Sequence, residues 1–236
     1  MAVQLDEGQA VLLGPVLRAG DGELVTDRPE RTLRILTDHA LLNLTWFRYE
    51  PGQEGPDPHV HYTHSDAFYI LDGELDLRLG PEVASFSAPA GTLCSAPPNF
   101  VHTFRNSSPS TALFLNIHAP GAGFADMMRA RRDGRDEEAD RFDQHDPPAD
   151  GGRPLADALV AVPDDSGARD PDGHFSLAKV ELAPGSSREV GTTAAVFVLE
   201  GALSLDGTGL SAGDFAFAQG GALHSDAGGR CVIIQT

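Results

Sequence analysis

The chain has no long hydrophobic run, little basic charge and almost no cysteine, and each shortage excludes a class of protein. No stretch approaches the roughly 18 uninterrupted apolar residues that a membrane span needs. Where a secretory signal would carry basic charge, the first twenty residues carry Asp6 and Glu7. These features predict a cytoplasmic protein that has no membrane partner.

Basic residues are outnumbered by acidic ones, 17 to 35, which gives a formal net charge of -18. Such a charge repels nucleic acid, so a polynucleotide partner is not expected. The acid excess is a solubility feature and says nothing about the substrate. The two cysteines, Cys94 and Cys231, lie in apolar strand-like stretches, which favours buried core thiols over a disulfide or redox pair.

Common catalytic motifs are also missing. The sequence contains no Walker-type phosphate loop, no Gly-x-Gly-x-x-Gly after a strand and no Gly-x-Ser-x-Gly elbow. What it does contain is glycine (26) and proline (17), scattered between short apolar runs. This distribution of glycine and proline is typical of short strands joined by tight turns, so the predicted fold class is all-β.

The clearest hairpin prediction runs from Ala67 to Leu79. An apolar run reaches an Asp72-Gly73 turn, after which leucines alternate with charged residues. A different spacing follows between Gly121 and Gly134, where apolar residues recur at helical intervals and arginines come late, so a short amphipathic helix is predicted.

The segment 135–154 is rich in Asp, Glu, Arg, Gly and Pro and has almost nothing apolar, as is typical of an exposed linker. We therefore predict an N-terminal domain over 1–120, a helix and linker over 121–154, and a C-terminal domain over 155–236.

An internal repeat indicates that the two domains are of one kind. The sequence pattern of Tyr69 to Leu77 is repeated in Phe197 to Leu205 at an offset of 128. Gly91 and His102 correspond to Gly213 and His224 at an offset of 122. The change of six residues falls between the two halves of each copy and indicates a shortened hairpin loop. Two copies of one β unit predict two barrels in tandem.

The first copy carries a histidine pattern that the second lacks. His59-Val60-His61 is followed after four residues by Asp66, and His102 comes later. Residues two apart on a strand point to the same face, so His59 and His61 project together. Three imidazoles and one carboxylate hold a metal ion and leave one or two positions open, as a reactive site requires.

This pattern resembles the two conserved motifs of the cupin superfamily, in which a His-x-His pair, a Glu and a later His bind one metal inside a small jelly-roll barrel. The resemblance is to quercetin dioxygenase-like cupins and covers about residues 35 to 135. It implies a bicupin in which His59, His61, Asp66 and His102 bind one divalent Fe, Mn, Ni or Zn ion.

Asp66 departs from that pattern, because it stands where glutamate is usual and reaches about 1.5 Å less far. It ligates directly, through water or not at all, and His64 is the possible substitute. The remaining histidines outside the motifs (His39, His118, His145 and His174) have no partner pattern and are expected to lie on the surface or in hydrogen bonds.

The second copy has no histidine between His174 and His224. The offset of 128 puts Ser187, Glu189 and Ala194 at the positions of the first copy's ligands. One imidazole alone does not hold a metal, so the C-terminal barrel is predicted to be structural.

Strand alternation predicts the walls of the pocket. The residues expected to face the metal with apolar surface are Phe68 and Ile70, beside Asp66, and Phe100 and Phe104, beside His102. On the strand before the first motif, Arg48 is expected to face outward.

The resemblance implies, first, a metal-dependent oxygenase acting on a small enolic, phenolic or otherwise oxygen-bearing molecule, with Asp66 also serving as catalytic base. The alternatives are a metal-dependent isomerase or epimerase of a carbonyl compound, and a non-catalytic module that binds a small ligand. A small-molecule substrate is the expected partner, and the family also implies a homodimer.

Overall fold

The structure is a computed structural model that describes residues 11–191 and 193–236, so Asp6 and Glu7 lie outside the described residues. Within these ranges strands dominate and the helices are short, which confirms the all-β fold class. None of the helices in this part of the chain has the length and apolarity needed to cross a lipid bilayer.

The chain divides into two compact units. One contains Gly22–Val162 and Arg169–His174, and the other contains residues 11–21, Pro163–Ala168 and Phe175–Thr236. The units therefore group residues 11–21 with the C-terminal barrel, and the helix and linker with the N-terminal barrel. The ranges 1–120, 121–154 and 155–236 stay predictions.

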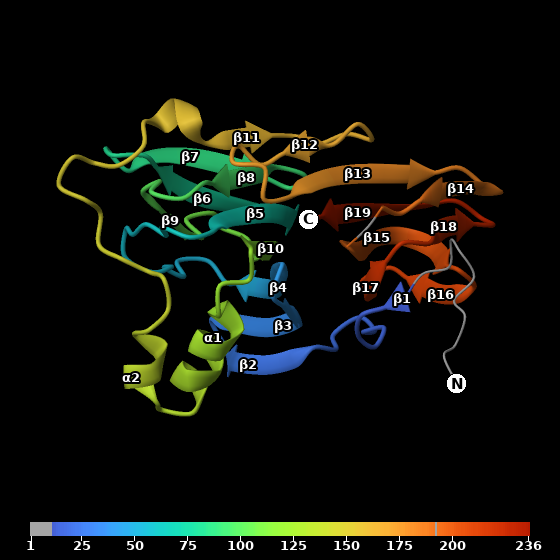
Figure 1. The fold of residues 1–236 in the computed structure, drawn as a ribbon, viewed down its shortest axis with the longest axis horizontal. Coiled ribbons are helices and arrows are strands. Elements are labelled where there is room, and N and C mark those ends of the chain that lie inside the picture. Colours follow the sequence, from blue (N-terminus) through green and yellow to red (C-terminus); the bar gives the residue numbers. More distant parts are fainter. Residues whose placement is uncertain (1–10, 192) are drawn as a thin grey trace. The chain divides into compact units, whose positions relative to one another are not determined.

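The N-terminal barrel packs two sheets face to face (Figure 1). Its strands are β2 (Glu23–Arg28), β3 (Arg31–His39), β4 (Leu42–Tyr49), β5 (Ser65–Asp72), β6 (Glu74–Leu79), β7 (Ala84–Pro89), β8 (Leu93–Ala96), β9 (His102–Arg105), β10 (Ala112–Ala119) and β11 (Leu159–Ala161). One sheet has the order β11-β8-β5-β10-β4-β3-β2 and the other β7-β6-β9. The helices are α1 (Phe124–Arg132), α2 (Asp136–Ala139) and the short 3-10 turn η1 (Leu155–Asp157).

The C-terminal barrel is built on the same plan. Its strands are β1 (Val11–Leu12), β13 (Ser176–Leu182), β14 (Ser186–Glu189), β15 (Thr193–Leu205), β16 (Thr208–Ser211), β17 (Phe215–Gln219), β18 (Ala222–Ser225) and β19 (Gly229–Gln235), and β12 (Ala168–Arg169) precedes β13. The main sheet runs β1-β17-β15-β19-β13, while β14 pairs with β18 and β16 with β15. The loop between β15 and β16 is two residues shorter than that between β6 and β7, which accounts for two of the six residues by which the offset of the repeat changes.

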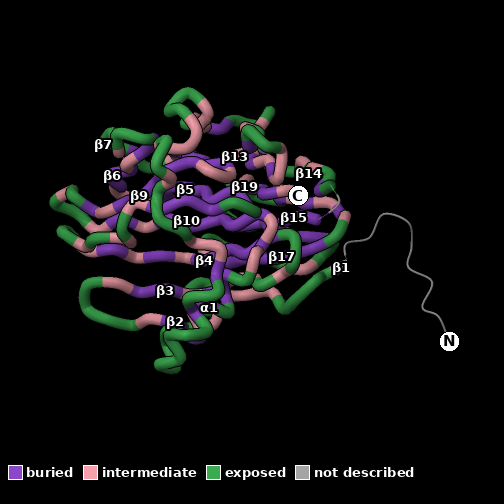
Figure 2. Tube along the Cα trace, turned by 60° about the vertical axis from the view of Figure 1, so that its left-hand side comes forward, coloured by how far each residue is buried: buried purple, intermediate pink, exposed green. Residues whose placement is uncertain are grey.

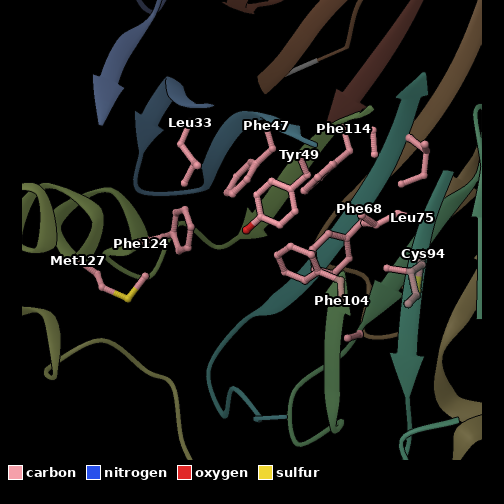
Figure 3. Close-up of a cluster of buried hydrophobic side chains, with 14 of the residues drawn as sticks. Leu33, Phe47, Tyr49, Phe68, Leu75, Cys94, Phe104, Phe114, Phe124 and Met127 are labelled. Atoms are coloured by element: carbon pink, nitrogen blue, oxygen red, sulfur yellow. The ribbon is translucent and has the colours of Figure 1, made fainter. Parts of the chain in front are cut away.

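Strand alternation fills the interior of the N-terminal barrel with aromatic rings (Figure 3). Phe114 stacks on Phe47 with 4.9 Å between centroids, and Phe104 lies 4.8 Å from Phe68. The purple tube in Figure 2 follows β4, β5 and β10, whose residues are nearly all buried. Both cysteines are free and buried, and burial raises the pKa of each thiol to about 12, so the prediction of core thiols is confirmed.

The predicted hairpin over Ala67 to Leu79 is wrong. β5 pairs with β8 and β10, whereas β6 pairs with β7 and β9, so the chain passes at Gly73 from one sheet to the other. Gly73 has φ +73°, and a Cβ there would lie 2.3 Å from the Thr111 carbonyl oxygen. An Asp-Gly pair does not distinguish a hairpin turn from a corner between two sheets, because both structures need a residue in the left-handed conformation. Gly201 repeats the corner in β15.

Two glycine substitutions separate backbone strain from crowding at this corner. Gly91→Ala is expected to cost about 1–2 kcal/mol of unfolding free energy, because its φ is +88° but no atom lies within 4 Å of the new Cβ. Gly73→Ala is expected to cost about 2–5 kcal/mol, because crowding against Thr111 adds to the same strain. Urea unfolding measures both, and equal losses would contradict the crowding.

The predicted helix is confirmed as α1, but the segment after it is more than an exposed linker. α2 interrupts it, and Ala139 and Phe142 are buried in the core of the N-terminal barrel. Asp143 accepts hydrogen bonds from the backbone of Tyr62 and Thr63. Two apolar residues spaced three apart are too few to stand out in a segment of this composition, yet they anchor it.

Candidate metal centre

The four predicted ligands come together at one end of the N-terminal barrel. His59 and His102 exchange backbone hydrogen bonds of 3.1 and 3.0 Å, which brings the first motif onto β9. Asp66 enters from the start of β5. His59, His61, Asp66 and His102 are all buried, and their ligand atoms lie within 4.8 Å of one another.

Backbone carbonyls fix which nitrogen of each ring is free. The Nδ1 atom of His59 lies 2.8 Å from the Asp57 oxygen, that of His102 lies 2.9 Å from the Phe100 oxygen, and that of His61 contacts the Asp143 carbonyl. A carbonyl only accepts, so each Nδ1 carries the hydrogen. The three Nε2 atoms are thus the ring nitrogens left to meet a metal, as in metal-binding histidines that outer partners orient.

Asp66 reaches the other ligands despite its short side chain. Its Oδ2 lies 3.1 Å from His102 Nε2 and 3.6 Å from His61 Nε2. Metal bonds of about 2.1 Å place adjacent ligands about 3.0–3.4 Å apart in octahedral or tetrahedral geometry. The distances from Asp66 Oδ2 to the two nitrogens are therefore close to those between neighbouring ligands of one ion. The donor set fits a divalent transition metal.

The protonation states agree with that role. Burial, followed by the neighbouring His102 and His61, lowers the pKa of His59 to about 3, so its ring is neutral. Burial alone would raise the pKa of Asp66, but nearby His118 and hydrogen bonds from His102 and His61 hold it well below its ordinary value. The centre therefore contains the ionised Asp66 carboxylate and the neutral ring of His59.

Asn116 and His118 belong to this centre although no motif marked them. They lie on β10, and both point inward because they are two residues apart. Asn116 Nδ2 donates to Asp66 Oδ1, and its Oδ1 faces His118 Nε2 at 3.0 Å. The prediction that His118 is a hydrogen-bonded residue therefore agrees with its contact. The signal that was missed is the Asn-x-His spacing, which matches that of His59 and His61.

His64 does not lie with the four predicted ligands. It forms a second group with His61 and His118, and the ligand atoms of these three lie within 4.8 Å of one another. His61 is the member that the two groups share.

A cavity of about 380 Å³ borders the centre. Its wall includes His59, His61 and Asp66, together with Asn116 and His118. Small-molecule sites commonly occupy roughly 300–1,000 Å³, so the cavity is large enough for a compact substrate.

Of the four predicted pocket residues, Phe104 borders this cavity, whereas Phe68, Ile70 and Phe100 are buried core residues. The aromatic wall comes instead from Phe47 and Tyr49 on β4 and from Phe124 on α1. Figure 3 shows the Tyr49 hydroxyl pointing towards the side of Phe124.

Arginines also border the cavity, in contrast to the acidic composition of the chain. They are Arg28 and Arg31, from β2 and β3, and Arg131 and Arg132, from α1. Arg31 Nε is buried and has no hydrogen-bond partner in the described ranges. Burial raises the pKa of Tyr49 to about 12, against the opposing effect of Arg31 beside it. Arg48 pairs with Glu50 and does not border the cavity.

The C-terminal barrel keeps the geometry without the ligands. Ser187 pairs with His224 between β14 and β18, as His59 pairs with His102 in the first copy. The Ser187 hydroxyl lies 3.0 Å from His224 Nδ1, and His224 Nε2 lies 2.8 Å from Asp226. A serine thus occupies the place of a ligand, and the single imidazole is held by side chains.

Comparison with known proteins supports the fold. Residues 45–118 match the Cupin domain family, and no curated protein matches the chain. The structure is similar to the bacterial pirin YhhW from Escherichia coli in complex with nickel(II), with a TM-score of 0.65 and 13% identity over 94% of this chain and 97% of that one.

Two further solved structures resemble the chain. An oxalate decarboxylase from Bacillus subtilis matches with a TM-score of 0.61 and 15% identity over 99% of this chain and 78% of that one. A putative glyoxylate-induced protein from Pseudomonas aeruginosa matches with a TM-score of 0.60 and 16% identity over 98% and 92%. At these identities the likeness is one of fold.

Proposed function

We propose that the N-terminal barrel of this chain, whose residues 45–118 match the Cupin domain family, binds one divalent Fe, Mn, Ni or Zn ion and acts as an oxygenase on a small phenolic or enolic molecule. The observation that carries the proposal is the convergence of three buried imidazoles and the Asp66 carboxylate beside a cavity. The nickel complex of the similar pirin is in keeping with such an ion.

His59, His61, His102 and Asp66 are the residues that would hold the metal. A bound ion would supply Lewis acidity and a template for substrate and O₂. In a dioxygenase both oxygen atoms enter the organic product, and the substrate provides all the electrons, so no further reductant is required.

Asp66 has a second role as the base. Its carboxylate is ionised and borders the cavity, so it can take the proton of a substrate hydroxyl and hold it at Oδ1 or Oδ2. Asn116 orients that carboxylate through its amide hydrogen bond. The aromatic wall excludes water from the reacting atoms.

The cavity also favours a class of substrate. Phe47, Tyr49, Phe104 and Phe124 suit a planar apolar body. Arg31 places an unpartnered N–H on the same wall, and the Tyr49 phenol stays protonated as a second donor. We therefore infer a substrate that combines a flat ring or enol with an anionic oxygen group.

Metal content and O₂ consumption test the proposal together. After reconstitution with Mn(II), the protein is expected to hold one ion per chain by inductively coupled plasma mass spectrometry. His59→Ala and His102→Ala are each expected to bind Mn(II) much more weakly, because each variant removes one of the four ligands. Phenolic and enolic compounds are then screened with the Fe(II) and Mn(II) forms for O₂ uptake, which both variants should lack.

His224→Ala is the matched control, because His224 occupies the place of His102 in the second barrel. It should keep Mn(II) and O₂ uptake. If the unaltered protein binds no stoichiometric ion after exposure to Fe(II), Mn(II), Ni(II) and Zn(II), the proposal of a metal-dependent enzyme is wrong. A metal-loaded protein that converts carbonyl compounds without O₂ would favour an isomerase instead.

A further inference from the structure

His61, His64 and His118 form a buried group beside the proposed metal site. The side chains of His64 and His118 are 0% and 1% exposed, and that of His61 is 2% exposed. Their rings are in contact, with centroids 4.2 Å apart for His61 and His64 and 5.1 Å apart for His64 and His118. Phe142 and Phe124 pack against the group, and His61 and His118 also border the cavity.

The free nitrogens of this group can be assigned. Asn116 donates its amide to Asp66, so its oxygen faces His118 Nε2, which must carry the hydrogen. In the neutral ring, His118 Nδ1 therefore carries no hydrogen and offers a lone pair. This atom has no hydrogen-bond partner among the described residues. His64 Nδ1 lies 3.2 Å from Asp143, yet within the described ranges neither ring nitrogen of His64 has a partner in hydrogen-bonding geometry.

Leaving such atoms buried without a partner is unfavourable. Each of the three residues has at least one such atom, and one ligand atom from each lies within 4.8 Å of the others, which indicates a ligand. His61 contributes Nε2, because its Nδ1 is bound to the Asp143 carbonyl. That same Nε2 is the atom His61 offers to the site of His59, Asp66 and His102. One nitrogen lone pair binds one ion at a time, so the two groups cannot be filled together through His61.

We propose that His61, His64 and His118 form a second metal position, and that a single ion occupies either this position or the one with Asp66. The second position offers three imidazoles and no carboxylate. Such a set suits Zn(II) and Cu(II), whereas Mn(II), which prefers oxygen ligands, takes the position with Asp66. The two metal positions share His61. This inference rests on the proposed function only for the position that contains Asp66.

Equilibrium dialysis of paired variants tests the second position. The double variant His59→Ala/His102→Ala is expected to lose Mn(II) but still to bind one Zn(II) per chain. His64→Ala is expected to keep Mn(II) and to bind Zn(II) more weakly than the unaltered protein. The three substitutions together should abolish the binding of both ions. Circular dichroism confirms that each variant is folded before it is dialysed.

Two results would overturn the inference. One is a folded His59→Ala/His102→Ala variant that binds no Zn(II). The other is two Zn(II) ions per chain in the unaltered protein, which would contradict exclusive occupancy. Failure of Mn(II) binding in the unaltered protein would count against the first position alone, so the two proposals fail separately.

Anomalous diffraction from crystals of the unaltered protein avoids the question of folding. Soaked Zn(II) is expected to give a peak among His61, His64 and His118, and Mn(II) a peak among His59, His102 and Asp66. If both ions give a peak only beside Asp66, the second position does not exist.

Discussion

Asp66→Asn is expected to lower the turnover of O₂ by about 100- to 10,000-fold, the range for removal of a positioned base. The amide keeps the shape of the carboxylate and can still accept the Asn116 hydrogen bond, so the fold should survive. It has no negative charge for a metal and cannot take a substrate proton. Steady-state O₂ electrode assays at saturating Mn(II) or Fe(II) separate slow chemistry from weak metal binding.

Asp76→Asn is the control for Asp66. Asp76 is also buried in the N-terminal barrel, but it pairs with Arg105 at 2.8 Å and does not border the cavity. Its loss should reduce stability and leave turnover per folded molecule unchanged. Asp66→Asn with full turnover at saturating metal would remove Asp66 from the mechanism.

The ligand set could be predicted from sequence because its spacing carries its own geometry. Side chains two residues apart on a strand point to the same face, so the sequence alone places His59 and His61 side by side. His102, which is distant in the sequence, was added through the resemblance to the second cupin motif. The reach of Asp66 was left open, because it depends on where β5 enters relative to β9, and that distance is a tertiary quantity.

Asp143 could not be predicted because nothing local distinguishes it, and the only local mark of His118 is its Asn-x-His spacing. His118 is at the site because β10 lies beside β5, with His118 opposite Asp66 in the register. Asp143 is there because Phe142, its neighbour, is buried in the barrel. The corner at Gly73 was mistaken for the same physical reason, since a left-handed glycine serves a hairpin and a change of sheet equally. Pairing partners, and not residue preferences, decide between the two.

Arg31→Gln is expected to weaken the binding of an anionic ligand by roughly 30- to several-thousand-fold, which corresponds to about 2–5 kcal/mol for one partner of a buried charged hydrogen bond. Arg31 is the cavity arginine whose Nε is buried and has no partner in the described part of the chain, so a bound anion would be its counter-charge. Calorimetric titration with para-hydroxybenzoate and with para-hydroxybenzamide compares two ligands of equal shape that differ in charge.

The unaltered protein should bind the benzoate more tightly than the benzamide, and Arg31→Gln should remove that difference by weakening the benzoate alone. Arg78→Gln serves as control, because Arg78 lies on β6 beside Asp76 and does not border the cavity. Equal losses for both ligands would mean that Arg31 shapes the wall without recognising charge. A preference for benzoate that survives in Arg31→Gln would shift the anion contact to Arg28, Arg131 or Arg132, and so from the inner wall of the cavity to its more exposed arginines.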